Sequence, residues 1–327
     1  MTSKTINAAT GLFDDTFGVG TFSRDGKPVP ALVRADGQSI DLSDKFYDTH
    51  QIFDDWDRNF DALVDLAATG RADFEFAKAE PLKPLAHPNL LCAGSNYKQH
   101  VAEMLTKNKF NQHNRKEGET DEEFYQRNYE AMEERQRTGT PFLWTGLHSS
   151  LIGANDEVVL PVLGDEPDWE VELGVVIGTA AKYVSEAEAL NHVAGYCVIN
   201  DVSEREFQIE RAGTWDKGKG CDTFGPTGPW LVTADEVGDF NALKMWLEVD
   251  GTRYQNGSTA TMVYKVPHLV SYCSQFMSLQ PGDVISTGTP PGVGMGLKPP
   301  KYLKGGETMR LGIDGLGVQT QTVRTAD

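Results

Sequence analysis

Short apolar runs rich in β-branched residues recur along the chain from about residue 89 onward, with glycine and proline between them. Runs of this length and composition predict strands, at residues 157–160, 171–177, 196–202, 247–249, 283–286 and 309–313. Few helical patterns lie between these runs, so the strand–helix alternation of a doubly wound sheet is not expected. The pattern predicts an α+β fold that is mostly β, with a mixed, mainly antiparallel sheet curled into a roll or barrel.

Residues 1–85 are expected to form a small N-terminal β-rich domain. Asp-Gly pairs at 25–26 and 36–37 lie between apolar stretches, which is typical of hairpin turns. Apolar residues at helical spacing then predict a helix over residues 51–67. Prolines between residues 81 and 88 end any helix, so we expect a domain boundary near residue 85.

The second domain, residues 86–327, is expected to carry a charged helical insertion at about residues 105–140. This segment is dense in both signs of charge and poor in β-branched residues. Residues 122–137 predict a surface helix with ion pairs four residues apart, Glu123 with Arg127 among them. The segment is either a solvated insertion, or a lid or dimer contact beside a neighbouring site, and the sequence leaves both open.

The charge of the chain narrows the classes of function. Its 327 residues include 30 Lys and Arg against 48 Asp and Glu, a formal net charge of -18. Such a chain repels a phosphate backbone and lacks the basic face that an anionic membrane attracts. No signal peptide, membrane-length apolar stretch or CxxC pair is found, so we expect a cytoplasmic protein without nucleic-acid or membrane partners.

Three acids fall at strand positions where they could meet. Glu170 and Glu172 alternate with apolar residues in one predicted strand, so both point to the same face. Alone, such a pair is most simply a solvent-exposed face. Asp201, however, ends a second apolar strand, and three carboxylates suit a hard divalent cation such as Mg²⁺ or Mn²⁺, which keeps positions open for a chelating substrate.

Two further segments carry candidate chemistry. His100 and Glu103 are three residues apart on a predicted helix, and they are either a surface pair or a base whose basicity the carboxylate raises. The Gly/Pro loop at residues 286–294 follows a strand, and its backbone N–H groups could hold a carboxylate or an oxyanion.

These segments, taken in order, resemble the fumarylacetoacetate hydrolase family. The matching pieces cover most of residues 89–315 and are NYKQHVAEM, DWEVELGVVIG, GYCVINDVSEREFQ, DKGKGCDTFGPTGPWLVT, a short QNGST turn and PGDVISTGTPPGVG. The resemblance implies a mixed β-roll catalytic domain, usually in a homodimer. It also implies a bound Mg²⁺, Mn²⁺ or Ca²⁺, with Mg²⁺ expected here, and a small anionic 2-oxo or 1,3-diketo acid as substrate.

The family's site residues fall on matching positions of this chain. Its metal ligands correspond to Glu170, Glu172 and Asp201, and its water-activating dyad to His100 and Glu103.

The remaining correspondences concern charge neutralisation and substrate binding. The active-site lysine of the family falls on Lys219, its substrate-binding Arg and Gln on Arg205 and Gln208, and its Gly-Thr pair on Gly288 and Thr289.

The resemblance therefore implies a metal-dependent hydrolase that cleaves a C–C bond in an acylpyruvate or a fumarylacetoacetate-like acid, as in the catabolism of aromatic compounds. The same chemistry supports two alternatives among enzymes, a decarboxylase or isomerase and a hydratase of a 2-oxo acid. A non-catalytic protein that binds small acids is the alternative from another class.

Overall fold

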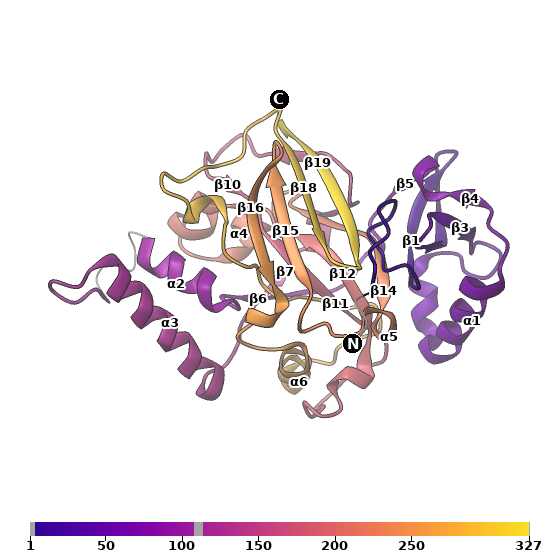
Figure 1. The fold of residues 1–327 in the computed structure, drawn as a ribbon, viewed down its shortest axis with the longest axis horizontal. Coiled ribbons are helices and arrows are strands. Elements are labelled where there is room, and N and C mark those ends of the chain that lie inside the picture. Colours follow the sequence, from indigo (N-terminus) through magenta and orange to yellow (C-terminus); the bar gives the residue numbers. More distant parts are fainter. Residues whose placement is uncertain (1–3, 108–113, 327) are drawn as a thin grey trace.

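The computed structural model describes residues 4–107 and 114–326. Two sheets pack against each other to form the body, with α2 and α3 projecting from one end and the N-terminal strands lying at the other (Figure 1). The six α-helices of the described chain are α1 (Trp56–Thr69), α2 (Lys98–Lys107), α3 (Asp121–Thr138), α4 (Trp215–Lys219), α5 (Ala234–Val237) and α6 (Val266–Phe276).

The larger sheet has the strand order β4-β3-β2-β1-β14-β12-β11-β17-β6-β7, with β5 paired to β1 and β8 to β14. Most neighbours are antiparallel, but β17 runs parallel to β6, so the sheet is mixed as predicted. Its strands are β1 (Phe17–Arg24), β2 (Lys27–Arg34), β3 (Gln38–Asp41), β4 (Phe74–Glu75), β5 (Glu80–Pro81), β6 (Leu90–Gly94), β7 (Phe142–Gly146), β8 (Leu151–Ile152), β11 (Val171–Ile177), β12 (Val193–Asn200), β14 (Gly225–Thr233) and β17 (Val284–Ser286).

The second sheet has the order β16-β15-β18-β19-β9 and covers one face of the first. Its strands are β9 (Val158–Leu160), β15 (Lys244–Val249), β16 (Thr252–Ser258), β18 (Thr308–Ile313) and β19 (Gly317–Thr325); a separate pair joins β10 (Pro167–Asp168) to β13 (Ser203–Glu204). Val171 and Leu173 of β11 lie in the core between the sheets, together with Leu247 of β15 and Leu311 of β18. Within the described residues neither sheet closes on itself, so the mostly β, α+β prediction is confirmed as a roll rather than a barrel.

The N-terminal strands have the predicted turns. Asp25 and Gly26 have φ values of 50° and 74°, the left-handed pair that a two-residue hairpin turn requires. The predicted helix over 51–67 is a 3₁₀ turn, η1 (Thr49–Asp55), followed by α1. Strand β1 also pairs with β14, so hydrogen bonds of one sheet cross the expected boundary near residue 85, and the two-domain division stays a prediction.

Two local predictions are wrong. Arg127 of α3 pairs with Glu119 at 2.7 Å, not with Glu123, because Glu123 closes a capping box with Thr120 at the start of the helix. The expected QNGST turn lies largely within strand β16, and the chain turns instead at Asp250 and Gly251, which have φ values of 49° and 74°. The insertion at 105–140 includes residues 108–113, which lie outside the described residues, so its role as a whole stays a prediction.

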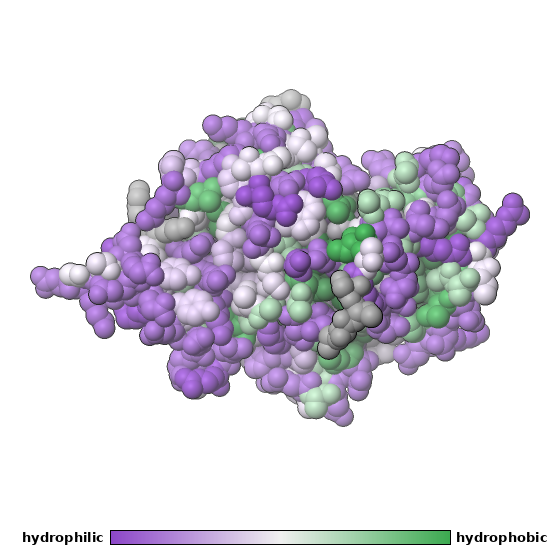
Figure 2. Space-filling model, in the orientation of Figure 1, coloured by the Kyte–Doolittle hydropathy of each residue, from purple (hydrophilic) through white to green (hydrophobic). Residues whose placement is uncertain are grey.

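One face of the surface shows how polar and apolar side chains are distributed. The face shown in Figure 2 is mostly hydrophilic, and its hydrophobic side chains form separate small areas. None of the helices in the described part of the chain has the length and apolar character that crossing a membrane requires.

Candidate active site

The register between β11 and β12 brings the three predicted acids together. Val171 pairs with Asn200, and the backbone N–H of Asp201 donates to the carbonyl oxygen of Glu170 at 2.9 Å. Asp201 therefore lies beside Glu170, while strand alternation puts Glu172 on the same face. One carboxylate oxygen from each of the three residues lies within 4.8 Å of the others.

These acids are not a solvent-exposed face. Glu170, Glu172 and Asp201 are only 5%, 3% and 8% exposed. Burial raises the pKa of Glu172 well above its usual value, and the charges of Asp201 and Glu170 raise it further. Burial also raises the pKa of Asp201 to about 6, although Lys219 opposes the change.

Two buried basic side chains balance part of this charge. Lys219, from α4, donates to Oε2 of Glu170 at 3.0 Å, to Oδ2 of Asp201 and to Oγ of Ser203 at 2.9 Å. Arg205 donates through Nη2 to Oε1 of Glu170 at 2.5 Å. Burial acts to raise the pKa of Glu170, but the charges of Lys219 and Arg205 outweigh it and hold that pKa at about 2.

The Gly/Pro loop after β17 holds Glu172. Oε2 of Glu172 accepts hydrogen bonds from Oγ of Ser286 at 2.5 Å and from the backbone N–H of Gly288 at 2.9 Å. Gly288 has a φ of 92°, and a Cβ there would lie 2.9 Å from Cβ of Asn96, so the position favours glycine. The N–H of Gly288 thus positions an acid in this structure, and its predicted contact with substrate stays a prediction.

The other predicted substrate-binding residues lie at the same pocket. Oε1 of Gln208 accepts from Nη1 of Arg205 at 2.9 Å. The Thr289 hydroxyl donates to the carbonyl oxygen of Val171 at 2.9 Å and accepts from Nε2 of Gln255 at 2.8 Å. These side chains hydrogen-bond to the protein around the pocket, and their predicted contacts with substrate stay predictions.

Asp168 is a site residue that sequence reasoning missed. It is fully buried, and Oδ2 accepts from Nε of Arg205 at 2.9 Å. Its two oxygens also accept from the backbone N–H groups of Trp169, Gly294 and Met295. Asp168 therefore links Arg205 by hydrogen bonds to the loop around η8 (Gly294–Gly296). The signal in the sequence for this residue was its position directly before the Trp-Glu-Val-Glu run.

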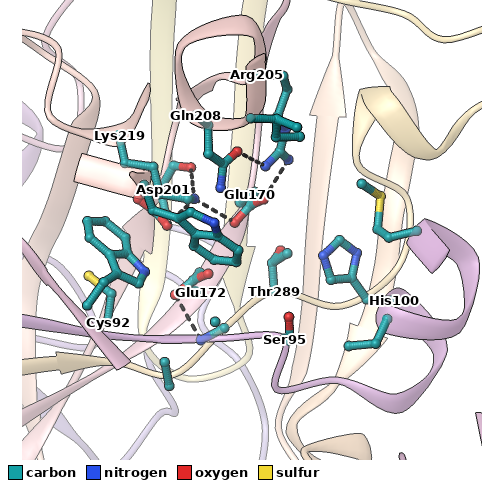
Figure 3. Close-up of a pocket in the computed structure, with 18 of the residues that line it drawn as sticks. Cys92, Ser95, His100, Glu170, Glu172, Asp201, Arg205, Gln208, Lys219 and Thr289 are labelled. Atoms are coloured by element: carbon teal, nitrogen blue, oxygen red, sulfur yellow. Dashed lines mark hydrogen bonds and ion pairs between the residues drawn. The ribbon is translucent and has the colours of Figure 1, made fainter. Parts of the chain in front are cut away.

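His100 lies on α2, across the pocket from Lys219 and Asp201 (Figure 3). Burial lowers its pKa to about 4, and the charges of Arg205 and Lys219 contribute, so the imidazole is neutral at pH 7. In the described part of the chain its buried Nδ1 has no hydrogen-bond partner.

The predicted partner of His100, Glu103, lies on the same helix. Oε2 of Glu103 lies 3.8 Å from the position that a Cβ on Gly296 would take. Among the described residues no hydrogen bond joins Nδ1 of His100 to Glu103, and the dyad stays a prediction.

The pocket has a volume of about 240 Å³, with the acids and basic groups on one side and His100 on the other (Figure 3). Within the described residues, Arg205 and Lys219 are the basic side chains that pair with the triad and Asp168, so with all four carboxylates ionised two negative charges would remain to be balanced. That deficit equals the charge of one divalent cation, and buried charges require compensation. The oxygen-only donor set of the triad therefore fits a hard divalent cation.

A mixed roll with an acidic triad and a neutral histidine at one pocket defines a candidate metal-dependent enzyme. A family model described as the C-terminal part of fumarylacetoacetate (FAA) hydrolase matches residues 89–324. The chain belongs to this family, whose named members include hydrolases and isomerases.

Several known proteins resemble most or about half of the chain. A Burkholderia ambifaria protein named "Putative hydrolase" is 67% identical over 184 residues, which are 56% of this chain and 64% of that relative. The match thus spans just under two thirds of the relative's length. The structure of fumarylacetoacetate hydrolase from Exiguobacterium antarcticum is 27% identical, with a TM-score of 0.73 over 95% of this chain and 100% of that one. That of 5-carboxymethyl-2-hydroxymuconate delta-isomerase from Mycobacterium smegmatis is 26% identical, with a TM-score of 0.69 over 95% and 99%.

Proposed function

We propose that this protein is a hydrolase that depends on a divalent cation and cleaves a C–C bond in a small 2-oxo or 1,3-diketo acid, such as an acylpyruvate. The observation that carries the proposal is the buried triad, whose three carboxylates each offer an oxygen within 4.8 Å of the others, in one pocket with a neutral histidine. Family membership and the hydrolases among the relatives support the reaction class.

Glu170, Glu172 and Asp201 would hold the cation. Mg²⁺ is the first candidate, since it prefers carboxylate oxygens and keeps several waters, and Mn²⁺ and Ca²⁺ share its preference for oxygen. When bound, such a cation polarises a carbonyl oxygen as a Lewis acid. Lys219 and Arg205 act as positioning residues, because their contacts with Glu170 set where its two oxygens lie.

His100 acts as the base. Its neutral imidazole accepts a proton from water, and the water oxygen adds to the distal carbonyl carbon of the substrate. The bond from that carbon to the neighbouring methylene then breaks, the methylene carbon takes up a proton, and a carboxylic acid and pyruvate leave. Glu103 would orient His100, and Lys219 would contact substrate only if it released one of its present partners.

The second candidate reaction is isomerisation or decarboxylation of a 2-oxo acid. The unpartnered Nδ1 of His100 supports it, because no carboxylate at that nitrogen raises the basicity of the ring toward water. A proton transfer between carbons of an enolised 2-oxo acid needs no water, and an isomerase is among the structural relatives.

The test uses protein stripped with EDTA and then supplied with Mg²⁺ or Mn²⁺. We expect the enol absorbance of acetylpyruvate to decay only with the cation, and NMR to detect acetate and pyruvate. His100→Gln should slow turnover about 100-fold or more, as for loss of a general base. Cation-independent turnover would refute the proposal. Carbon dioxide or an isomer as the only product would replace hydrolysis by the second candidate, and binding without turnover would indicate a small-acid binding protein.

The cytoplasmic location, the homodimer and a role in the catabolism of aromatic compounds stay predictions from the sequence. Sedimentation of the purified chain at several concentrations measures its state of association.

A further inference from the structure

Part of the lining of the pocket is apolar, and it begins beside Lys219, whose Nζ lies 5.7 Å from the centroid of the Trp144 ring. This apolar wall comes from four elements, α2, β7, the π-turn η6 (Glu206–Glu210) and α4. The apolar side chains that line it are Val101, Met104, Leu105, Trp144, Ile209 and Trp215. Apart from Val101 these side chains are half-buried; Leu105 and Trp144 pack against the protein core as well as lining the pocket.

The aromatic part of this wall is fixed by packing. The ring of Trp215 packs against Phe142 at 4.8 Å and Trp144 at 6.5 Å between centroids. A Cβ on Gly94 would lie 2.5 Å from the Trp215 ring, so the glycine allows the indole to lie against the sheet. Rigid aromatic surface of this kind favours an apolar group over a charged one.

The described lining of the pocket offers no free cation to a second anionic group. Its two basic side chains, Arg205 and Lys219, both point to the acid side and are bound by carboxylates. His100 is neutral at pH 7. A carboxylate placed against the apolar wall would therefore lose water without gaining an ion pair, which strongly disfavours its binding.

We propose that the substrate has a single carboxylate, in its 2-oxo acid end, and an apolar alkyl or aryl group at the far end. The inference rests on the proposed function, because that function sets which end faces the triad. It separates this chain from relatives named for fumarylacetoacetate and 5-carboxymethyl-2-hydroxymuconate, compounds that carry more than one carboxylate.

Turnover tests the proposal first. With Mg²⁺ present, kcat/KM for benzoylpyruvate or hexanoylpyruvate should exceed that for fumarylpyruvate by about 10-fold or more, the usual effect of matching one apolar contact. Ile209→Arg places a cation in the wall and should reverse this preference. Glu210→Gln, an exposed neighbour that changes the net charge by the same amount, is the matched control and should keep it.

Binding separates this inference from the proposed function. Calorimetry of the Mn²⁺-loaded protein compares 2-oxoglutarate with 5-methyl-2-oxohexanoate, in which an isopropyl group replaces the distal carboxylate. Tighter binding of the apolar acid supports the inference even if no C–C bond is cleaved, in which case only the proposed function fails. Equal or tighter binding of 2-oxoglutarate, or faster cleavage of fumarylpyruvate, overturns the inference while leaving metal-dependent cleavage intact.

Discussion

Replacing Asp168 by asparagine should destabilise the fold more than any single surface change. The side chain is fully buried, and its Oδ1 accepts from the N–H groups of Trp169 at 2.8 Å and Gly294 at 2.6 Å. Its Oδ2 accepts from Nε of Arg205 at 2.9 Å and from the N–H of Met295 at 3.0 Å. In Asp168→Asn one of these oxygens becomes an amide N–H₂ that faces donors, and the guanidinium loses one of its two buried counter-charges.

The expected loss follows from these contacts. Two hydrogen bonds are lost, each contributing about 1 kcal/mol, and more where the donor is charged. Removing one partner of a buried ion pair destabilises by about 3–5 kcal/mol. Since Arg205 keeps Glu170, we expect the free energy of unfolding to fall by about 3–4 kcal/mol.

Urea unfolding followed by circular dichroism measures this difference. EDTA in every sample removes the contribution of cation binding, and one protein concentration is used throughout. Asp165→Asn, an exposed acid nearby, is the control and should change stability by no more than about 0.5 kcal/mol. A loss of under about 1 kcal/mol for Asp168→Asn, with an unchanged slope against urea, would refute the reasoning.

Three further outcomes are expected. Glu172→Gln should weaken Mn²⁺ binding, measured by electron paramagnetic resonance, by at least about 10–100-fold. The control Glu248→Gln lies on β15, outside the pocket, and should bind Mn²⁺ like the parent protein. Equal affinities of the two variants would exclude Glu172 as a ligand. Because burial raises the pKa of Asp201 to about 6 and that of Glu172 well above its usual value, protons compete with the cation, so affinity should fall as the pH drops through about 6. A flat profile would contradict the assignment. Gly288→Ala should destabilise the fold by about 1–3 kcal/mol in thermal unfolding, because its φ of 92° and the nearby Asn96 leave no room for a Cβ; an unchanged melting temperature would count against this.

The triad could be predicted because strand alternation is a local property. Glu170 and Glu172 lie two residues apart with apolar residues between them, so a common face follows from the sequence. That Asp201 reaches them depends on the pairing of β11 with β12, which the order of the motifs suggested but no local pattern fixes.

Other features depended on partners far away in the sequence. Asp168 was missed because two of its donors, Arg205 and the N–H of Gly294, lie 37 and 126 residues away along the chain. The Glu123–Arg127 pair was wrong because spacing on a helix does not reveal the competing Glu119 or the helix cap. The QNGST turn was wrong because a glycine in a paired strand looks, in one sequence, like a glycine in a turn.

The pairing of β1 with β14 has a consequence for synthesis of the chain. Gly18 pairs with Val232 and Val19 with Leu231, so the partners are separated by about 210 residues. At roughly 5–20 residues per second, β1 leaves the ribosome about 10–40 s before β14. The β1–β2 hairpin can form at once and β5 can pair with Phe22 and Ser23 soon afterwards, but the N–H and C=O groups at Gly18 and Val19 stay unpaired on the second edge of β1. Recruitment of chaperones to the growing chain is therefore expected in this interval, before β14 is synthesised and pairs with β1.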